Sequence, residues 1–393
     1  MKEVKWMSET VKFKIFYFLR YFGDAFFYPF MTMYFIYKGM QENQVGIILA
    51  ITPIITILVN PIWNFIVKDT KISRLVLKIM TLLEGLFIIL LTQISGLELY
   101  ALLIGLIAFF CSPFISIQDG YTSTYTNIHK IEYSSIRIYA SIAYVIASAI
   151  AGFIIQYIGY TLPFIISGTF FALTALVAFW IKPIERDIIQ EKKKKRDLKA
   201  LFRNANFYKY LIFYTLVIGA VRIADSYFGI FLTNELNLSL SMYGLLYAGF
   251  VSVEVITLRF LTIKGSLYQE RTLIMIASLL FFIRIFTYAL YLPLGLMLAI
   301  TMLRGLSWGT IIYTNIKYVI KIVKVENITS AILFMTLTFS LFIGIGNFIF
   351  GSLIKVIGYQ WLYVIDAGLI LIGLLIFFIF PSKTSELSEY TDS

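Results

Sequence analysis

Several charged side chains lie deep inside long hydrophobic stretches of this sequence. They are Asp24, Glu84, Asp225, Glu254, Arg284 and Arg304. A charge in the middle of a membrane-spanning helix costs about 3 kcal/mol or more unless it meets a partner or water. We therefore expect these residues to face the protein interior or a wet pathway, where they could bind a polar solute or carry a proton.

Two of these charges have an opposite charge about one helical turn away. Arg20 is four residues before Asp24, and Arg222 is three residues before Asp225. Residues at these spacings share a helix face, so each pair can neutralise itself. Arg20 and Arg222 are the expected charge partners, either in structural ion pairs or in pairs that exchange partners when a solute or proton arrives. Glu84 has no obvious partner in the sequence.

Two stretches carry polar residues at the three-residue and four-residue spacing of one helical face. The first holds Asp119, Thr122, Ser123, Thr126 and Asn127, and the second holds Arg304, Ser307, Trp308 and Asn315. In lipid, a polar helix face must turn toward protein or water. We expect both helices to line the interior, with helix packing that involves no solute contact as the alternative.

The elements that must position these residues are membrane helices. With 60% hydrophobic and 14% charged residues, the chain has too little polar surface for a soluble globule. Its apolar runs recur at about the 20 residues that span a bilayer, and they lack the alternation of barrel strands. This predicts an all-α membrane protein with about twelve spans. The expected spans are residues 13–37, 43–66, 74–95, 98–128, 134–157, 160–182, 206–232, 240–264, 271–292, 294–321, 327–356 and 359–381.

The net charge of +11 is distributed in a way that orients helices in a membrane. Basic residues gather in alternate loops, for example Lys68 to Arg74 and Lys192 to Arg196, whereas the opposite loops near Met40, Gly159 and Asn237 have almost none. We therefore expect a multi-pass protein of the cytoplasmic membrane with both termini cytoplasmic. A nucleic-acid partner is not expected, because the basic residues serve topology.

The two halves of the chain resemble one another. The tetrapeptide Tyr-Thr-Asn-Ile occurs at 125–128 and again at 313–316, and the segment 152–160 is echoed by 351–359. Arg20 and Asp24 likewise have counterparts in the seventh span. Two parallel six-helix repeats place a solute site at their interface near the bilayer midplane.

The only long polar stretch separates these repeats. It predicts four parts of the chain. They are an N-terminal six-helix bundle at 1–182, a cytoplasmic basic linker at 183–205, a C-terminal six-helix bundle at 206–382 and a short cytoplasmic tail at 383–393.

Cysteine and histidine are too scarce for metal or redox chemistry. Cys111 and His129 are the single examples of their types, and no nucleophile or phosphate-binding motif accompanies them. We therefore expect neither an enzyme nor a cofactor or metal.

These residues also carry a resemblance to a known family. The segment Ala25-Phe-Phe-Tyr-Pro-Phe, followed by Gln44-Val-Gly-Ile-Ile-Leu-Ala and by Lys68-Asp69, resembles the first two helices of the major facilitator superfamily. More narrowly, the chain resembles the lactose permease-like branch of oligosaccharide and nucleoside proton symporters. The resemblance implies the major facilitator fold, two pseudo-symmetric six-helix bundles, and a loop motif that ends in Asp69.

The resemblance implies a solute-binding group in the first half. Asp119 precedes Arg137 by the separation of the acidic and basic sugar-binding residues of the lactose permease, and Tyr144 stands where that permease has an aromatic sugar platform. The alternative for Arg137 is that it only snorkels to the membrane surface at the cytoplasmic end of the fifth span. Arg284 and Arg304 also fall into register, and Glu254 resembles the eighth-helix Glu of the family. The candidate substrate-binding residues are Asp119, Arg137, Tyr144, Asn127, Trp308, Asn315, Arg284 and Arg304.

The proton site of the permease has no counterpart here. Ser307 stands where the permease has its proton-carrying Glu, and Arg304 where it has a neighbouring His; Asn64 replaces the usual Gly of the loop motif. If transport is driven by protons, another buried carboxylate must carry the proton, and desolvation favours the neutral form that this requires. The proton-coupling candidates are Asp24, Asp225 and Glu254.

We therefore expect a secondary transporter that imports a small polar solute, an oligosaccharide or a nucleoside, with protons. We also expect a monomer whose partners are the solute, protons and the lipid bilayer. An exporter of drugs or metabolites is the alternative, but the fifth span lacks the Gly-Pro pair typical of drug antiporters. A non-transporting receptor or scaffold would have little reason to keep these charges.

Overall fold

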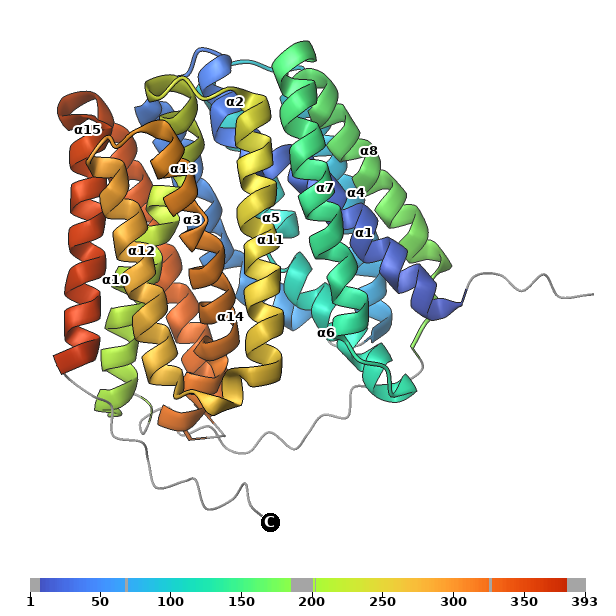
Figure 1. Ribbon diagram of the computed structural model, residues 1–393. Helices are drawn as coiled ribbons and strands as arrows, with labels where there is room; N and C mark the ends of the chain where they lie inside the picture. The colour runs from blue at the N-terminus through green and yellow to red at the C-terminus, as the bar shows by residue number, and fades with distance from the viewer. Residues whose placement is uncertain (1–7, 68–69, 185–200, 202, 325–326, 380–393) are drawn as a thin grey trace, which may run out of the picture. The chain divides into compact units, whose positions relative to one another are not determined.

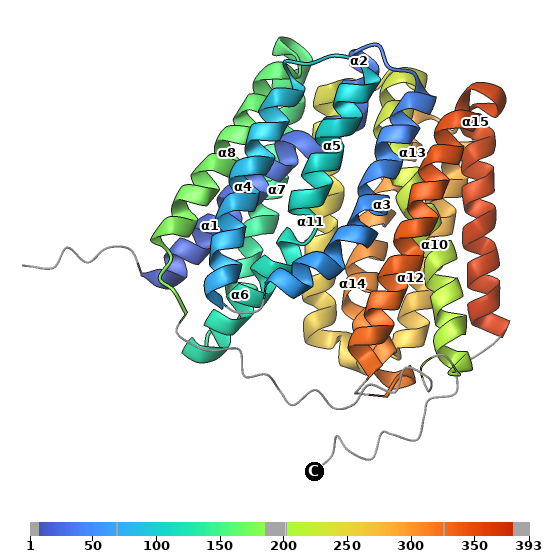
Figure 2. The same ribbon diagram turned by 180° about the vertical axis from the view of Figure 1, so that it is seen from behind.

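The computed structural model describes residues 8–67, 70–184, 201, 203–324 and 327–379, and these residues form helices and short connections (Figures 1 and 2). The helices that precede the basic stretch are α1 (Glu9–Phe27), η1 (Tyr28–Phe30), α2 (Met31–Tyr37), α3 (Glu42–Ile66), α4 (Thr70–Leu91), α5 (Leu97–Cys111), α6 (Phe114–His129), α7 (Ser134–Ile158) and α8 (Thr161–Trp180). The helices that follow it are α10 (Ala205–Ile230), η2 (Phe231–Glu235), α11 (Leu240–Lys264), η3 (Gly265–Leu267), α12 (Glu270–Ala289), α13 (Leu294–Thr301), α14 (Leu303–Ile322) and α15 (Ile328–Ile379).

Prolines divide two of the predicted spans into shorter helices. Pro29 lies at the start of η1 and separates α1 from α2, and Pro113 lies between α5 and α6. Proline has no backbone N–H to donate and its ring restricts the preceding residue, so a helix that reaches it ends or bends. The predicted spans 13–37 and 98–128 are therefore each built from two helical pieces.

The described helices group into twelve segments of spanning length. Nine helices are long and apolar enough to cross a membrane by length and composition, and one of these, Ser330–Ile379, contains two spans. Gly358, with φ of 75°, breaks α15 between them. The remaining two segments, α1 with α2 and then α4, are charge-rich: Arg20 and Asp24 lie in the first and Glu84 in the second. This agrees with the predicted spans.

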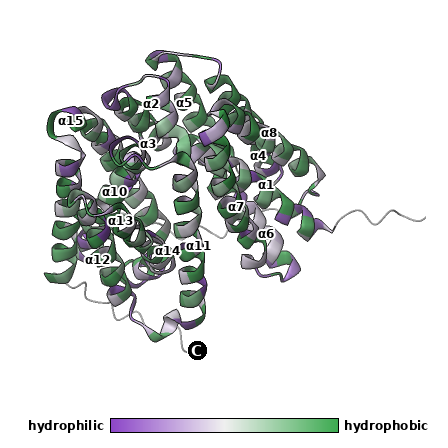
Figure 3. Cartoon of the chain, turned by 45° about the horizontal axis from the view of Figure 1, so that its top comes forward, coloured by the Kyte–Doolittle hydropathy of each residue, from purple (hydrophilic) through white to green (hydrophobic). Residues whose placement is uncertain are grey.

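The outer surface of the helices is apolar and polar side chains are buried, which is the reverse of a soluble protein. Leu58, Phe65 and Val356 expose 66%, 72% and 77% of their surface, whereas Glu84, Arg284 and Asp366 expose none. Hydrophobic residues cover most of the helical ribbon in Figure 3. The exposed apolar side chains are suited to contact with lipid, and each buried charge needs a protein partner or water.

The chain divides into two compact units. The first comprises residues 1–189 and 229–248, and the second residues 190–228 and 249–393. In the first unit α1 packs against α7 and α8, and α4 packs against α8 and α5; in the second, α12 packs against α14 and α15. The domain boundaries predicted from the sequence stay a prediction. The basic run of the predicted linker and the tail at 383–393 lie outside the described residues.

The internal repeat appears in the backbone. Gly159 ends α7 with φ of 98°, and Gly358 breaks α15 with φ of 75°. A left-handed φ favours glycine because it has no Cβ to clash with the backbone. The repeated Ile-Gly-Tyr sequences thus make the same kind of helix end at matching places in the two halves.

Close helix packing in the second unit depends on two glycines spaced by one turn. A Cβ built on Gly309 would lie 2.7 Å from the carbonyl oxygen of Glu254 and 2.9 Å from the Cβ of Thr257, and one built on Gly305 would lie 2.8 Å from the backbone nitrogen of Glu254. Small residues at this spacing let helix backbones approach closely in membranes. α14 is therefore packed directly against the middle of α11.

Gly309→Ala is expected to lower folding stability by about 1–3 kcal/mol, because the added methyl group must force α14 away from α11. Thermal unfolding of the purified full-length protein in detergent would measure the effect. The matched control is Gly368→Ala, since a Cβ there meets nothing within 4 Å. Equal unfolding temperatures for the two variants would contradict the close approach.

Candidate functional site

Buried charges of the first unit form a network around one arginine. Nη1 of Arg20 lies 3.3 Å from Oδ1 of Asp24, and Nη2 lies 3.0 Å from Oε2 of Glu84. The hydroxyl of Tyr28 also donates to Oε1 of Glu84 at 2.6 Å. α1 supplies Arg20 and Asp24 from one face, as the four-residue spacing predicts, and α4, another helix of the same unit, supplies Glu84.

Aromatic rings enclose this network. The guanidinium of Arg20 lies 4.3 Å from the ring centre of Phe114 and 4.2 Å from that of Phe171. The rings attract the cation through their faces and exclude water from it. One cation thus faces two carboxylates in a dry setting, which leaves the group with a net negative charge when both carboxylates are ionised.

A second polar group of the first unit contains the predicted solute-binding residues. The hydroxyl of Tyr17 donates to Oδ1 of Asp119 at 2.9 Å, and the Tyr17 and Tyr133 hydroxyl oxygens are 3.5 Å apart. The guanidinium of Arg137 lies 4.7 Å from the ring centre of Tyr21 and within electrostatic range of Asp119. Among the described residues no ion pair joins Asp119 to Arg137, so each keeps hydrogen-bonding capacity that a solute could use.

The aromatic residue of this group lies two turns along α7 from Arg137. The ring centre of Tyr144 is 5.9 Å from that of Tyr247, and its ring is partly buried. Tyr133 lies in the connection before α7, where burial raises the pKa of its hydroxyl above the ordinary value, so the hydroxyl stays protonated at neutral pH. The structure therefore brings Asp119, Arg137 and tyrosine hydroxyls together on α1, α6 and α7.

The second unit has its own buried charge network, centred on Asp225 of α10. Nη2 of Arg284 lies 2.8 Å from Oδ1 of Asp225, and Nε of Arg304 lies 3.0 Å from Oδ2. Arg284 is completely buried. Two cations from α12 and α14 therefore share one carboxylate. Such charge-assisted bonds are the strong kind when water is excluded.

Arg222 occupies a different place from the one expected. Its guanidinium lies 4.2 Å from the ring centre of Trp308, and no ion pair within 4.0 Å joins it to Asp225 among the described residues. Arg284 and Arg304 occupy both carboxylate oxygens of Asp225 instead. The ring of Trp308 is buried and packs edge-on against Phe281 at 5.4 Å.

The other candidate residues are dispersed. Asn127 is exposed near the end of α6, and Oδ1 of Asn315 accepts from the hydroxyl of Tyr210 at 2.8 Å. Glu254 is half-buried where α11 meets α14, and Ser307 donates to the backbone oxygen of Leu303 at 2.9 Å. Asp69, the last residue of the loop motif, lies outside the described residues.

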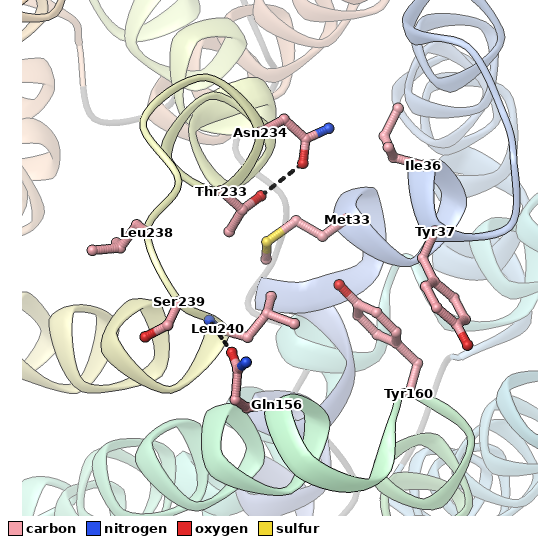
Figure 4. Close-up of a pocket in the computed structure, with 10 residues that line it drawn as sticks. All are labelled: Met33, Ile36, Tyr37, Gln156, Tyr160, Thr233, Asn234, Leu238, Ser239 and Leu240. Carbon is pink, nitrogen blue, oxygen red and sulfur yellow. Dashed lines mark hydrogen bonds between the residues drawn. The ribbon is translucent and has the colours of Figure 1, made fainter.

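A pocket of about 350 Å³ lies in the first unit, away from these charges (Figure 4). Met33, Tyr37, Gln156 and Tyr160 line it together with the segment 233–240, and its ten lining residues include no charged side chain. Figure 4 shows Gln156 accepting a hydrogen bond from the backbone nitrogen of Leu240, at 2.8 Å. This hydrogen bond joins the end of α7 to the start of α11, and the lining of the pocket includes none of the candidate site residues.

Sequence patterns missed two contributors to these networks and one further buried acid. Tyr17 and Tyr28 resemble the many other aromatic residues of the helices, and only the fold shows that their hydroxyls donate to Asp119 and Glu84. Asp366 of α15 is fully buried in the second unit, and an acidic residue inside a predicted span was the available signal. Within the described residues, no group of three or more His, Cys, Asp or Glu could hold a metal ion.

Comparisons with known proteins agree with this architecture. The chain is 25% identical over 319 residues to the uncharacterized transporter YwbF of Bacillus subtilis (strain 168), covering 79% of this chain and 77% of that protein. It is 23% identical over 317 residues to the maltose permease of Geobacillus stearothermophilus, covering 80% of each. The structure matches a mutant of the nucleoside transporter NupG with a TM-score of 0.82 at 15% identity, covering 95% of this chain and 99% of that one.

The structural match shows the fold alone, and it confirms the predicted all-helical major facilitator architecture. The family model described as the MFS_1 like family matches residues 10–365, which is most of the chain. The predicted family and the prediction of a transporter rather than an enzyme are thereby confirmed. The protein belongs to the MFS_1 like family and is a multi-pass membrane transporter of the major facilitator type.

Proposed function

We propose that this protein imports an oligosaccharide or a nucleoside together with protons across the cytoplasmic membrane, by alternating access and as a monomer. The observation that supports the proposal is the group formed by Asp119, Arg137 and Tyr17 in the first unit, with Tyr144 two turns along α7 from Arg137. Names of similar proteins point the same way, since one is a maltose permease and another a nucleoside transporter. Both kinds of solute carry several hydroxyl groups on a ring.

The chemistry of the group fits such solutes. An ionised carboxylate accepts hydrogen bonds from solute hydroxyls, and a guanidinium donates to their oxygens in a fixed fork. The Tyr144 ring offers a flat face against which the apolar side of a sugar can pack. Asp119 already accepts from Tyr17, so a solute hydroxyl would use its remaining lone pairs. Asn127, Trp308, Asn315, Arg284 and Arg304 stay further candidates for solute contact.

The coupling proton requires a carboxylate that can become neutral during the cycle. Asp24, Asp225 and Glu254 stay the candidates from the sequence. Asp24 lies 3.3 Å from an arginine that it shares with Glu84, so it can lose this partner without leaving Arg20 unpaired. We propose that Asp24→Asn leaves exchange of solute intact and abolishes its accumulation.

Uptake by right-side-out vesicles tests the function. Labelled oligosaccharides and nucleosides would be offered one at a time under an imposed pH gradient, with and without a protonophore. Accumulation that the protonophore abolishes supports proton-coupled import. Uptake that ignores the gradient refutes the coupling, and accumulation of the solute inside inverted vesicles with an acidic lumen would favour an exporter.

Asp119→Asn is expected to weaken solute binding about 10-fold to 100-fold. A hydrogen bond to a charged group is worth about 1.5–3 kcal/mol, and the amide removes the charge. The half-saturation concentration of uptake measures the change. Thr124→Ala on the same helix is the control, because the Thr124 hydroxyl donates to the carbonyl of Gly120 one turn earlier. An unchanged half-saturation concentration in Asp119→Asn would remove this residue from the site.

A further inference from the structure

Asp366 is a buried acid that neither the binding group nor the sequence-based proton candidates include. Its side chain is fully buried, and both carboxyl oxygens lack a hydrogen-bond partner. No ion pair within 4.0 Å includes it among the residues that the structure describes. An ionised carboxylate in a dry, unpaired position is very unfavourable, so this conformation holds the neutral acid.

Aromatic packing places Asp366 close to the Asp225 network. The rings of Tyr288 and Tyr363 meet edge-on at 5.3 Å, and both are buried. Arg284 is one turn before Tyr288 on α12, and Asp366 is one turn after Tyr363 on the second span of α15. The ninth and twelfth spans run in opposite directions, so Arg284 and Asp366 lie on the same side of this ring contact. Asp366 is within electrostatic range of both Asp225 and Arg284.

Arg284 has donors that could serve a second carboxylate. Its Nη2 bonds to Asp225, whereas Nε and Nη1 are buried and have no hydrogen-bond partner. Arg304 independently holds the other oxygen of Asp225 at 3.0 Å. Asp225 is therefore shared by Arg284 and Arg304. Arg284 still has unused N–H donors, and Asp366 has unused oxygen acceptors.

We propose that Asp366 is a proton-binding residue whose protonation state decides whether Arg284 pairs with Asp225 alone or also with Asp366. When the O–H bond of the acid breaks, the electron pair stays on the carboxylate and the proton passes to water of the compartment to which the network is open. The carboxylate then attracts the unused donors of Arg284. Asp225 keeps Arg304 as its partner throughout.

Several charged and titratable groups surround the proposed site and would respond to its charge. Asp225 of α10, Arg284 of α12 and Tyr363 of α15 are within electrostatic range of Asp366 itself. Further groups interact with these three: Arg222 of α10, Tyr288 of α12, Arg304 of α14 and Tyr359 of α15. Arg284 stabilises an ionised Asp366, and the charge of Asp225 opposes it. The proposal rests on the proposed function for its role in transport, but the binding of a proton can be tested without a solute.

Infrared difference spectra of the full-length protein in liposomes, recorded after a step in pH, test proton binding directly. We expect a C=O band of a buried carboxylic acid that is lost in Asp366→Asn, shifted in Asp366→Glu and unchanged in Ser278→Ala. Ser278 is a suitable control because it is equally buried in the same unit and donates to the carbonyl of Ile274 in its own helix. A band unaffected by the Asp366→Glu substitution overturns the proposal, even if Asp366→Asn fails to fold.

Transport assays then separate this proposal from the proposed function. If the wild-type protein accumulates a solute under a pH gradient, Asp366→Asn should lose accumulation and keep solute exchange. Equal accumulation by the variant and the wild type would overturn the role of Asp366 and leave the function standing. If the infrared band is lost in Asp366→Asn but the wild-type protein accumulates no solute under a pH gradient, the proton site is supported and the proposed function is refuted.

Discussion

Asp225→Asn is expected to lower the stability of the fold by about 3–5 kcal/mol, the cost of breaking a buried ion pair by removing one partner. The substitution removes the carboxylate that Arg284 and Arg304 share, and it takes from the fully buried guanidinium of Arg284 its ion pair with Asp225. Arg222 cannot neutralise Arg284 or Arg304, because it is itself a cation, and its guanidinium lies over the ring of Trp308. Thermal unfolding of the detergent-purified protein would show the loss.

The control for this variant is an exposed ion pair in the same unit. Lys321 and Glu270 lie 2.6 Å apart with side-chain exposures of 50% and 19%. Exposed pairs contribute about 0–1 kcal/mol because water and salt screen them. Glu270→Gln should therefore barely change the unfolding temperature. If Asp225→Asn is as mild as Glu270→Gln, the buried network does not hold the unit together.

Arg20→Met is expected to be of comparable severity in the first unit. It removes the only cation that bonds to both Asp24 and Glu84 within the described network, and it leaves two carboxylates facing one another in a dry site. Like charges at short range with no water to screen them oppose folding, unless one carboxylate takes up a proton. The unfolding temperature should fall and should recover partly at acidic pH.

Two further variants separate charge from packing at this position. The combined variant Arg20→Met, Asp24→Asn, Glu84→Gln removes the whole network and should recover much of the stability, because methionine still fills the space between Phe114 and Phe171. Arg20→Lys should be intermediate, since an ammonium group cannot form the same fork toward two partners. If the combined variant is as unstable as Arg20→Met, the loss of stability comes from altered packing and not from unpaired charge.

The sequence predicted those features that local patterns determine. The hydrophobic runs placed the twelve spans, and the four-residue spacing of Arg20 and Asp24 predicted the pair that α1 forms. The repeated Ile-Gly-Tyr marked two equivalent helix ends. Each of these depends on residues close together in the chain, and periodicity along a helix is sufficient to find them.

The rest depends on which helices meet, and one sequence carries no signal for that. Glu84 lacked a partner in the sequence because Arg20 is on another helix, and Asp225 found Arg284 and Arg304 on two other helices in place of nearby Arg222. Asp366 was not among the predicted site residues. Its distinguishing feature is that both carboxyl oxygens are buried without a hydrogen-bond partner, and the sequence carries no signal for this. The solute-binding role of Asp119 and Arg137 stays a prediction.

Proton movement driven by solute tests the central claim most directly. The purified protein in liposomes, loaded with a pH-sensitive dye, would receive each oligosaccharide and nucleoside in turn with no imposed gradient. We predict that one solute class acidifies the lumen, that a protonophore abolishes the signal and that Asp119→Asn shifts its concentration dependence upward. Entry of a labelled solute into the liposomes with no change in internal pH would contradict proton-coupled import.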